Sequence, residues 1–196
     1  MSNTEMPFDN RLKLIQVGLA LFARRGYSSV GVQEIVKAAG VTKPTLYHYF
    51  GHKQGLLEAI LAAYSPAFLS CLQKAADYQG DLILCLEGLV KGYLDLVQAE
   101  PDFFYLQLSM SYLPAEHETE PLIQPFRQAL QALLEQLFIQ AVPQHGNLKG
   151  HHALLASSLT GLLNHSALGL LKGGLENRSD LVHRVVKQYM YGIYVL

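Results

Sequence analysis

The chain has 196 residues, of which 50% are hydrophobic, and a formal net charge of −1. This length and apolar content predict one large or two small folded domains, and the near-zero charge excludes a surface that is basic all over. The charge is uneven: residues 1–60 carry seven Lys and Arg against four acids, a net of +3, and the other residues carry eight against twelve, a net of −4. We therefore expect any polyanion to bind the N-terminal part.

Several features favour a cytoplasmic protein. The first ten residues, MSNTEMPFDN, lack the basic and apolar regions of a signal peptide. Cys71 and Cys85 lie in apolar segments, so we expect two small buried residues in a reducing compartment. Residues 153–171 contain no Asp, Glu, Lys or Arg and approach the length of a membrane span. Their six polar side chains, without flanking aromatic or basic clusters, favour a helix of a soluble protein.

Helical periodicity dominates the chain, and no alternating strand pattern stands out, so we expect an all-α fold. The first helix is predicted over residues 9–25, with Asp9 as its N-cap and Gly26 as its end. Its apolar stripe consists of Leu12, Ile15, Leu19 and Phe22.

Two short helices separated by a glycine turn are predicted next, over residues 32–39 and 43–50. In the first, Ile35 and Val36 point inward and Glu34 can help to cap the helix. Gly40 ends that helix in the left-handed conformation. The second begins after the N-cap Thr42 and has Pro44 in its first turn, where a missing N–H costs nothing.

Longer helices are predicted for the remainder. One follows the sequence GHK and continues to about Gly80, with a bend at Pro66. The others are expected over about 81–98, 101–112, 121–141, 151–171 and 179–194, separated by segments rich in Pro and Gly.

The layout of residues 32–50 is that of a helix-turn-helix, whose second helix enters the DNA major groove. Leu46 and Phe50, four residues apart, can share a core-facing side, whereas Lys43, Tyr47 and Tyr49 project elsewhere. Lysine neutralises phosphate, tyrosine hydroxyls bond phosphate oxygens, and small apolar groups contact thymine methyls. The alternative is a helical bundle in which these aromatic rings only form a core.

The sequence LFARRGYSSVGVQEIVKAAGVTKPTLYHYFGHKQGLLEAIL, residues 21–61, resembles the DNA-binding region of the TetR family of bacterial transcriptional regulators. The resemblance implies a helix-turn-helix DNA-binding domain over residues 1–53 and a larger helical effector-binding and dimerisation domain over residues 54–196. It also implies a homodimer that binds a palindromic operator and releases it when a small molecule binds. The DNA-contacting residues that it indicates are Lys43, Pro44, Thr45, Tyr47, His48, Tyr49 and Lys53.

The sequence departs from the family pattern at four positions in this region. Val30 and Gly31 replace the usual Thr or Ser before the second helix, Gln33 stands where a basic residue is frequent, and His52 replaces a small polar cap before Lys53. We expect these departures to weaken individual phosphate contacts and to leave the motif intact.

The C-terminal part is expected to provide a dimer contact and an effector pocket. The uncharged helix of residues 153–171 and the tail of residues 189–196 are too apolar for one chain to cover, which indicates an interface. The small residues Ala156, Ser157, Thr160, Gly161 and Ala167 would let helices approach closely. The residues expected to line a pocket for an apolar or aromatic effector are Tyr64, Phe68, Tyr93, Phe103, Phe104, Gln107, Met110, Asn164 and His165.

No catalytic, metal or cofactor site is predicted. The adjacent His151 and His152 point about 100° apart on a helix, so they cannot share an ion as an i, i+4 pair can. No nucleophile motif, glycine-rich phosphate loop or paired carboxylates stand out. The sequence therefore predicts a DNA-binding regulator; the alternative is an all-helical small-molecule binding protein or enzyme without DNA-binding function.

Overall fold

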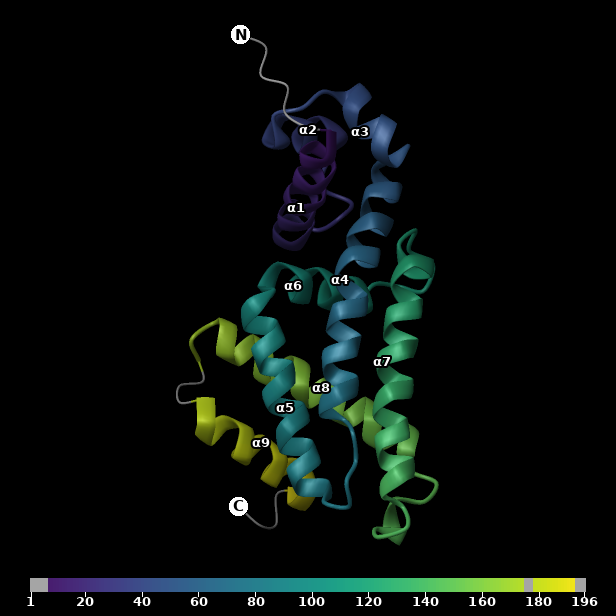
Figure 1. Ribbon diagram of the computed structural model, residues 1–196, viewed down its shortest axis with the longest axis vertical. Coiled ribbons are helices and arrows are strands. Elements are labelled where there is room, and N and C mark those ends of the chain that lie inside the picture. The colour runs from purple at the N-terminus through teal and green to yellow at the C-terminus, as the bar shows by residue number, and fades with distance from the viewer. Residues whose placement is uncertain (1–6, 175–177, 193–196) are drawn as a thin grey trace. The chain divides into compact units, whose positions relative to one another are not determined.

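The computed structural model describes residues 7–174 and 178–192, and the regular elements in these ranges are helices (Figure 1). The all-α prediction is confirmed. The elements are α1 (Pro7–Arg25), α2 (Val32–Ala39), α3 (Lys43–Phe50), α4 (Lys53–Ala75), α5 (Leu82–Ala99), α6 (Pro101–Ser111), α7 (Glu120–Ala141), the 3₁₀ helix η1 (Gly146–Leu148), α8 (His152–Leu171) and α9 (Arg178–Tyr191).

The chain divides into two compact units, and each contains two separate stretches of sequence. Unit 1 contains the residues up to Pro66 together with Asp102–Pro125, and unit 2 contains Ala67–Pro101 together with the residues from Phe126 onward. Compactness does not identify the residues that bind DNA, so the expected domain boundary at residue 53 stays a prediction. Unit 1 combines the helix-turn-helix with residues of α6 and the α6–α7 loop.

The first helix differs from its prediction in two respects. It begins at Pro7, so Asp9 lies inside α1 and is not its N-cap. Leu12 is 48% exposed, whereas Leu14 is buried together with the predicted Ile15, Leu19 and Phe22. The buried face passes through Gly18, where an added Cβ would lie 2.9 Å from the Leu56 side chain. Because Gly18 has no side chain, hydrophobic periodicity could not place the centre of this face.

Unit 2 is built around α5, which contacts both α8 and α9. Its buried side chains include Leu86, Leu89, Val90 and Tyr93. Helix α4 ends at Ala75, before the expected end near Gly80, and its interior contains Pro66. Cys71 is exposed, contrary to the prediction, whereas Cys85 is buried as predicted.

One face of α8 is not covered by the rest of the chain, and it carries no Asp, Glu, Lys or Arg. Leu154 is 69% exposed, and Ser157, Gly161 and His165 are exposed along the same helix. Ala156 and Ala167, predicted at the dimer contact, are instead 0% exposed within the chain.

Both α4 and α8 have the length and mean hydropathy of a membrane span, with 33% of each apolar window buried. Core helices of soluble proteins meet the same criteria, so this finding is weak evidence for a membrane.

Candidate nucleic-acid interface and effector site

The helix-turn-helix has the predicted boundaries because its caps define them locally. Gly40 adopts the left-handed conformation, with φ of 65°, and its N–H donates to the carbonyls of Val36 and Lys37 at the end of α2. Thr42 then caps α3 by accepting a hydrogen bond from the Thr45 N–H, at 3.4 Å. These two caps give a short connection between α2 and α3, as the major-groove motif requires.

The side chains of α3 separate into a buried and an outer set. Leu46 is 0% exposed and Phe50 is 9% exposed, as predicted. Lys43, Pro44 and His48 are exposed, and Tyr47 is 46% exposed.

Two predicted DNA-contacting residues on α3 are less accessible. Thr45 is half-buried, and its hydroxyl lies 2.9 Å from that of Thr42. Tyr49 is half-buried beside the His48 ring, at 5.2 Å between centroids. The outer surface of α3 is therefore centred on Lys43, Tyr47 and His48.

A very tight connection joins α3 to α4. Gly51 has φ of 72° and ψ of −47°, and the His52 N–H donates to the Phe50 carbonyl at 2.8 Å, which forms a γ-turn. The Nδ1 atom of His52 accepts a hydrogen bond from the Gly55 N–H at 2.9 Å. His52 thus caps α4 in the position where the family pattern has a small polar residue.

Lys53 makes contacts that its sequence context did not reveal. Its Nζ donates to the backbone carbonyls of Tyr27 at 3.0 Å and Val30 at 3.1 Å. The same atom lies 4.0 Å from the centroid of the Tyr27 ring, in a cation–π contact. Lys53 therefore connects the start of α4 to the turn between α1 and α2, and its phosphate contact stays a prediction.

A second contact reaches the α1–α2 turn from the α6–α7 loop. The Ser28 hydroxyl lies 3.2 Å from Nε2 of His117, and Nδ1 of His117 accepts from the Thr119 N–H at 3.2 Å. The phenol of Tyr27 in this turn has a raised pKa, chiefly because it is buried and secondarily because Glu118 and Glu58 are near. No pattern in the sequence joins residues this far apart.

The other basic side chains of unit 1 differ in whether they are already engaged within the protein or could bind a DNA phosphate. Arg25 forms an ion pair with Glu34, which therefore does not cap α2 as predicted. The guanidinium of Arg11 lies 5.7 Å from the centroid of the Phe50 ring. Lys37 and Lys43 are exposed and have no hydrogen-bond or ion-pair partner among the residues that the structure describes.

The predicted effector residues of unit 1 form an aromatic and polar cluster on α4 and α6. The rings of Tyr64 and Phe103 stack, with 5.5 Å between centroids and 19° between planes. Phe104, Gln107 and Met110 are buried on α6. Gln107 is only 4% exposed, and its Nε2 has no hydrogen-bond acceptor within the described part of the chain. A buried donor of this kind is costly unless a partner is supplied.

Three of the four predicted effector residues of unit 2, Phe68, Tyr93 and Asn164, are packed together. Phe68 meets Tyr93 edge to face, at 5.6 Å, and the Tyr93 hydroxyl donates to Oδ1 of Asn164 at 2.5 Å. His165, the next residue on α8, is exposed and does not share this buried environment. Asn164 already has a partner inside the protein, so it is a weaker candidate for effector binding than Gln107.

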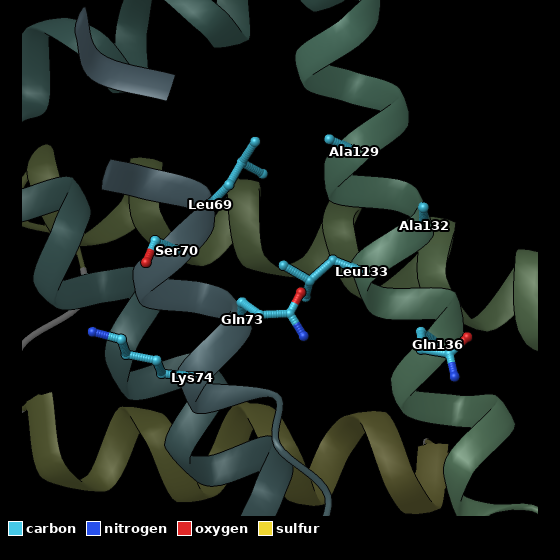
Figure 2. Close-up of a pocket in the computed structure, with 8 residues that line it drawn as sticks. All are labelled: Leu69, Ser70, Gln73, Lys74, Ala129, Ala132, Leu133 and Gln136. Atoms are coloured by element: carbon cyan, nitrogen blue, oxygen red, sulfur yellow. The ribbon is translucent and has the colours of Figure 1, made fainter. Parts of the chain in front are cut away.

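An open groove of about 650 Å³ lies between the C-terminal part of α4 and α7 (Figure 2). Figure 2 shows Gln73 and Leu133 pointing toward one another across it, with Lys74 directed to the side away from α7. The groove includes none of the predicted effector residues. Its lining consists of Leu69, Ser70, Gln73, Lys74, Ala129, Ala132, Leu133 and Gln136.

Among the described residues, no three His, Cys, Asp or Glu side chains gather as a metal site would require. The cap formed by His52 and the contact formed by His117 show that two histidines of unit 1 have other structural uses.

Comparisons with known proteins agree with this geometry. Residues 14–60 match the model of the bacterial regulatory proteins of the tetR family. The transcriptional regulator AcuR of Cereibacter sphaeroides is 47% identical over 62 residues, which are 32% of this chain and only 28% of that relative. Residues 14–60 contain the whole helix-turn-helix, in which the predicted and observed helix boundaries coincide.

Two solved structures extend the likeness over nearly the whole chain. FadR from Bacillus halodurans, a fatty acid degradation regulator, has a TM-score of 0.75 and 20% identity, covering 99% of this chain and 98% of its own. FadR from Bacillus subtilis, solved in complex with stearoyl-CoA, has a TM-score of 0.75 and 18% identity, covering 93% and 99%. At these identities the likeness shows a shared fold. Residues 14–60 therefore match the DNA-binding region of the TetR family of bacterial transcriptional regulators, and the chain as a whole shares the fold of these two solved regulators.

Proposed function

We propose that this protein is a ligand-responsive, dimeric transcriptional repressor of the cytoplasm, which binds a palindromic operator and leaves it when a small molecule binds. The observation that carries the proposal is the outer surface of α3. Lys43, Tyr47 and His48 face outward from a capped helix-turn-helix whose apolar side is buried. Such a surface can place a cation and hydrogen-bonding groups in the major groove.

The proposal is tested by selecting binders of the purified protein from a random duplex library. We expect enrichment of a palindrome whose half-sites lie one helical turn, about 34 Å, apart. The variant Tyr47→Ala should lose most of the affinity for that duplex and retain the helical content and melting temperature, because the Tyr47 side chain is half exposed. Failure of the wild-type protein to enrich any sequence would favour a small-molecule binding protein or enzyme without DNA-binding function.

The exposed face of α8 supports a homodimer. Leu154, Ser157 and Gly161 offer an apolar and sterically open surface, and a packed helix from a second copy would cover it. The variant Leu154→Glu should shift the protein toward monomer in sedimentation velocity. Leu84→Glu on α5 is the matched control, since Leu84 is similarly exposed, at 67%, and should leave the oligomeric state unchanged. Residues 193–196 of the predicted interface lie outside the described residues.

The effector is proposed to be apolar with at least one hydrogen-bond acceptor. Gln107 supports this choice, because its buried Nε2 can donate to an acceptor that the ligand brings. Acyl-CoA thioesters are the first compounds to screen, since the Bacillus subtilis protein of the same fold was solved with stearoyl-CoA. They combine an apolar chain with a carbonyl oxygen.

The variant Gln107→Leu identifies the site of the effector. If an acyl-CoA acts through Gln107, this variant should still bind operator and should need a higher thioester concentration for release. The control Gln73→Leu lies in the α4–α7 groove. Altered release in the control, with normal release in Gln107→Leu, would move the effector site to that groove.

A further inference from the structure

We propose that Lys53 serves DNA binding as a positioning residue, which holds the α1–α2 turn in place, and does not bind a DNA phosphate. This inference rests on the proposed DNA-binding function. It assigns a different role to one residue of the predicted DNA-contacting set and leaves the outer surface of α3 as it stands.

The ammonium group of Lys53 is already engaged within its own chain. It donates to the Tyr27 and Val30 carbonyls, at 3.0 and 3.1 Å, and contacts the face of the Tyr27 ring. An ammonium has three N–H donors. A phosphate at this position would therefore have to share the group with two backbone carbonyls and an aromatic ring.

Withdrawing the ammonium toward DNA would disturb buried parts of the protein. Tyr27 is 6% exposed and Val30 is 1% exposed, so both carbonyl-bearing residues belong to the core of unit 1. Buried backbone carbonyls are nearly always hydrogen-bonded, and bonds to a charged donor are stronger than those to a neutral one. The contacts therefore favour a lysine that stays with the turn.

The α1–α2 turn, which Lys53 holds, directly precedes α2 and can therefore set the position of the DNA-binding helices. Val30 is followed by Gly31, the N-cap of α2, and because a glycine has no side chain, no N-cap side chain fixes the start of this helix. Helix α2 contacts α3, so a displaced turn would move α2 and change the direction of α3. Lys53, at the start of α4, joins the beginning of this motif to the helix that follows it.

Other lysines fit the phosphate-binding role better. Lys43 is exposed on α3 and Lys37 is exposed on α2, and neither has a hydrogen-bond or ion-pair partner in the described ranges. Each can approach DNA without giving up a contact within the protein, whereas Lys53 would give up its bonds to two carbonyls, of which that of Tyr27 also accepts from the Val30 N–H. Lys43 therefore provides a matched control for Lys53, because both are single lysines at the N-terminus of a helix.

The test measures operator affinity against salt concentration for Lys53→Gln and Lys43→Gln, with the duplex selected by the wild-type protein. Loss of a phosphate contact lowers the slope of log K against log[salt] by about 0.9. We expect this fall for Lys43→Gln. For Lys53→Gln we expect an unchanged slope and an affinity lowered by about tenfold, since two charge-assisted hydrogen bonds are lost.

Amide hydrogen exchange gives a second readout that a general loss of stability would not reproduce. The Val30 N–H donates to the Tyr27 carbonyl at 3.3 Å, so its exchange should become faster in Lys53→Gln while the amides of α5 keep their protection. A slope lowered by about 0.9, with Val30 protection unchanged, would overturn the positioning role.

A third variant covers the case in which Lys53→Gln does not fold. Tyr27→Leu removes the ring beneath the ammonium and keeps the charge of Lys53. The positioning role predicts weaker operator binding with an unchanged salt slope, whereas unchanged affinity would contradict it. A wild-type protein that selects no duplex would overturn the proposed function itself, a result distinct from any of these.

Discussion

Replacing Gly55 by alanine should destabilise the protein, although alanine is the better helix former. A Cβ at this position would overlap the Phe50 carbonyl oxygen, a backbone atom held by the γ-turn at Gly51. Overpacking costs about 1–3 kcal/mol and loss of the His52 cap about 1 kcal/mol, whereas helix propensity returns about 1 kcal/mol. We therefore expect the free energy of unfolding to fall by about 1–3 kcal/mol.

The assay is urea unfolding followed by circular dichroism, with Gly88→Ala as the control. Gly88 is an exposed residue inside α5, and an added Cβ there would lie 3.8 Å from its nearest neighbour, the Ala75 carbonyl oxygen, an ordinary contact. Gly88→Ala should stabilise the protein by about 0.5–1 kcal/mol. The two variants thus have opposite expected signs. Stabilisation by Gly55→Ala would refute the close approach of α4 to the end of α3.

Three further predictions concern contacts within single units. Tyr93→Phe should lower the free energy of unfolding by about 1–3 kcal/mol, because it leaves the buried carbonyl of Asn164 without its donor; urea unfolding measures this. In the folded protein a thiol reagent should modify Cys71 and spare Cys85, whose pKa is raised to about 11 by burial and by nearby carboxylates. The unfolded thiol, with an ordinary pKa of 9.0, loses its proton first, so the free energy of unfolding should fall between pH 9 and about 11. The fall should be smaller in Cys85→Ala, in which only the tyrosines with a raised pKa, such as Tyr27, still contribute. Ser28→Ala should cost about 0.5–1.5 kcal/mol and speed amide exchange in the α1–α2 turn, because the turn loses its contact with the α6–α7 loop; normal protection there would contradict the contact.

The parts predicted correctly are those whose signals are local in sequence. Gly40, Thr42 and Pro44 act on their own backbone or on residues a few positions away, so they define the ends of α2 and α3 without tertiary information. The inward positions Leu46 and Phe50 follow equally from the four-residue spacing on one helix. This agreement explains why the helix-turn-helix could be placed to the residue.

The parts that were not predicted depend on contacts between distant segments. Leu12 was assigned to the core by periodicity, but the approach of α4 at Gly18 turns a neighbouring face of α1 inward. Cys71 was expected to be buried because its neighbours are apolar, yet it lies on an exposed face of α4. Hydrophobic spacing indicates that a helix has an apolar face and does not say which neighbours cover it.

The predicted effector residues also could not be sorted without knowing their contacts with distant segments. An aromatic or amide side chain in an apolar segment is equally suited to a core and to a pocket, so the sequence grouped Asn164 with Gln107. The structure separates them by their hydrogen bonds: Asn164 accepts from Tyr93, whereas Nε2 of Gln107 has no acceptor in the described part of the chain. Lys53 follows the same logic, since its two carbonyl partners weaken the case for a phosphate contact. A polar residue is therefore the stronger candidate for ligand binding when its own fold leaves its hydrogen-bonding capacity unused.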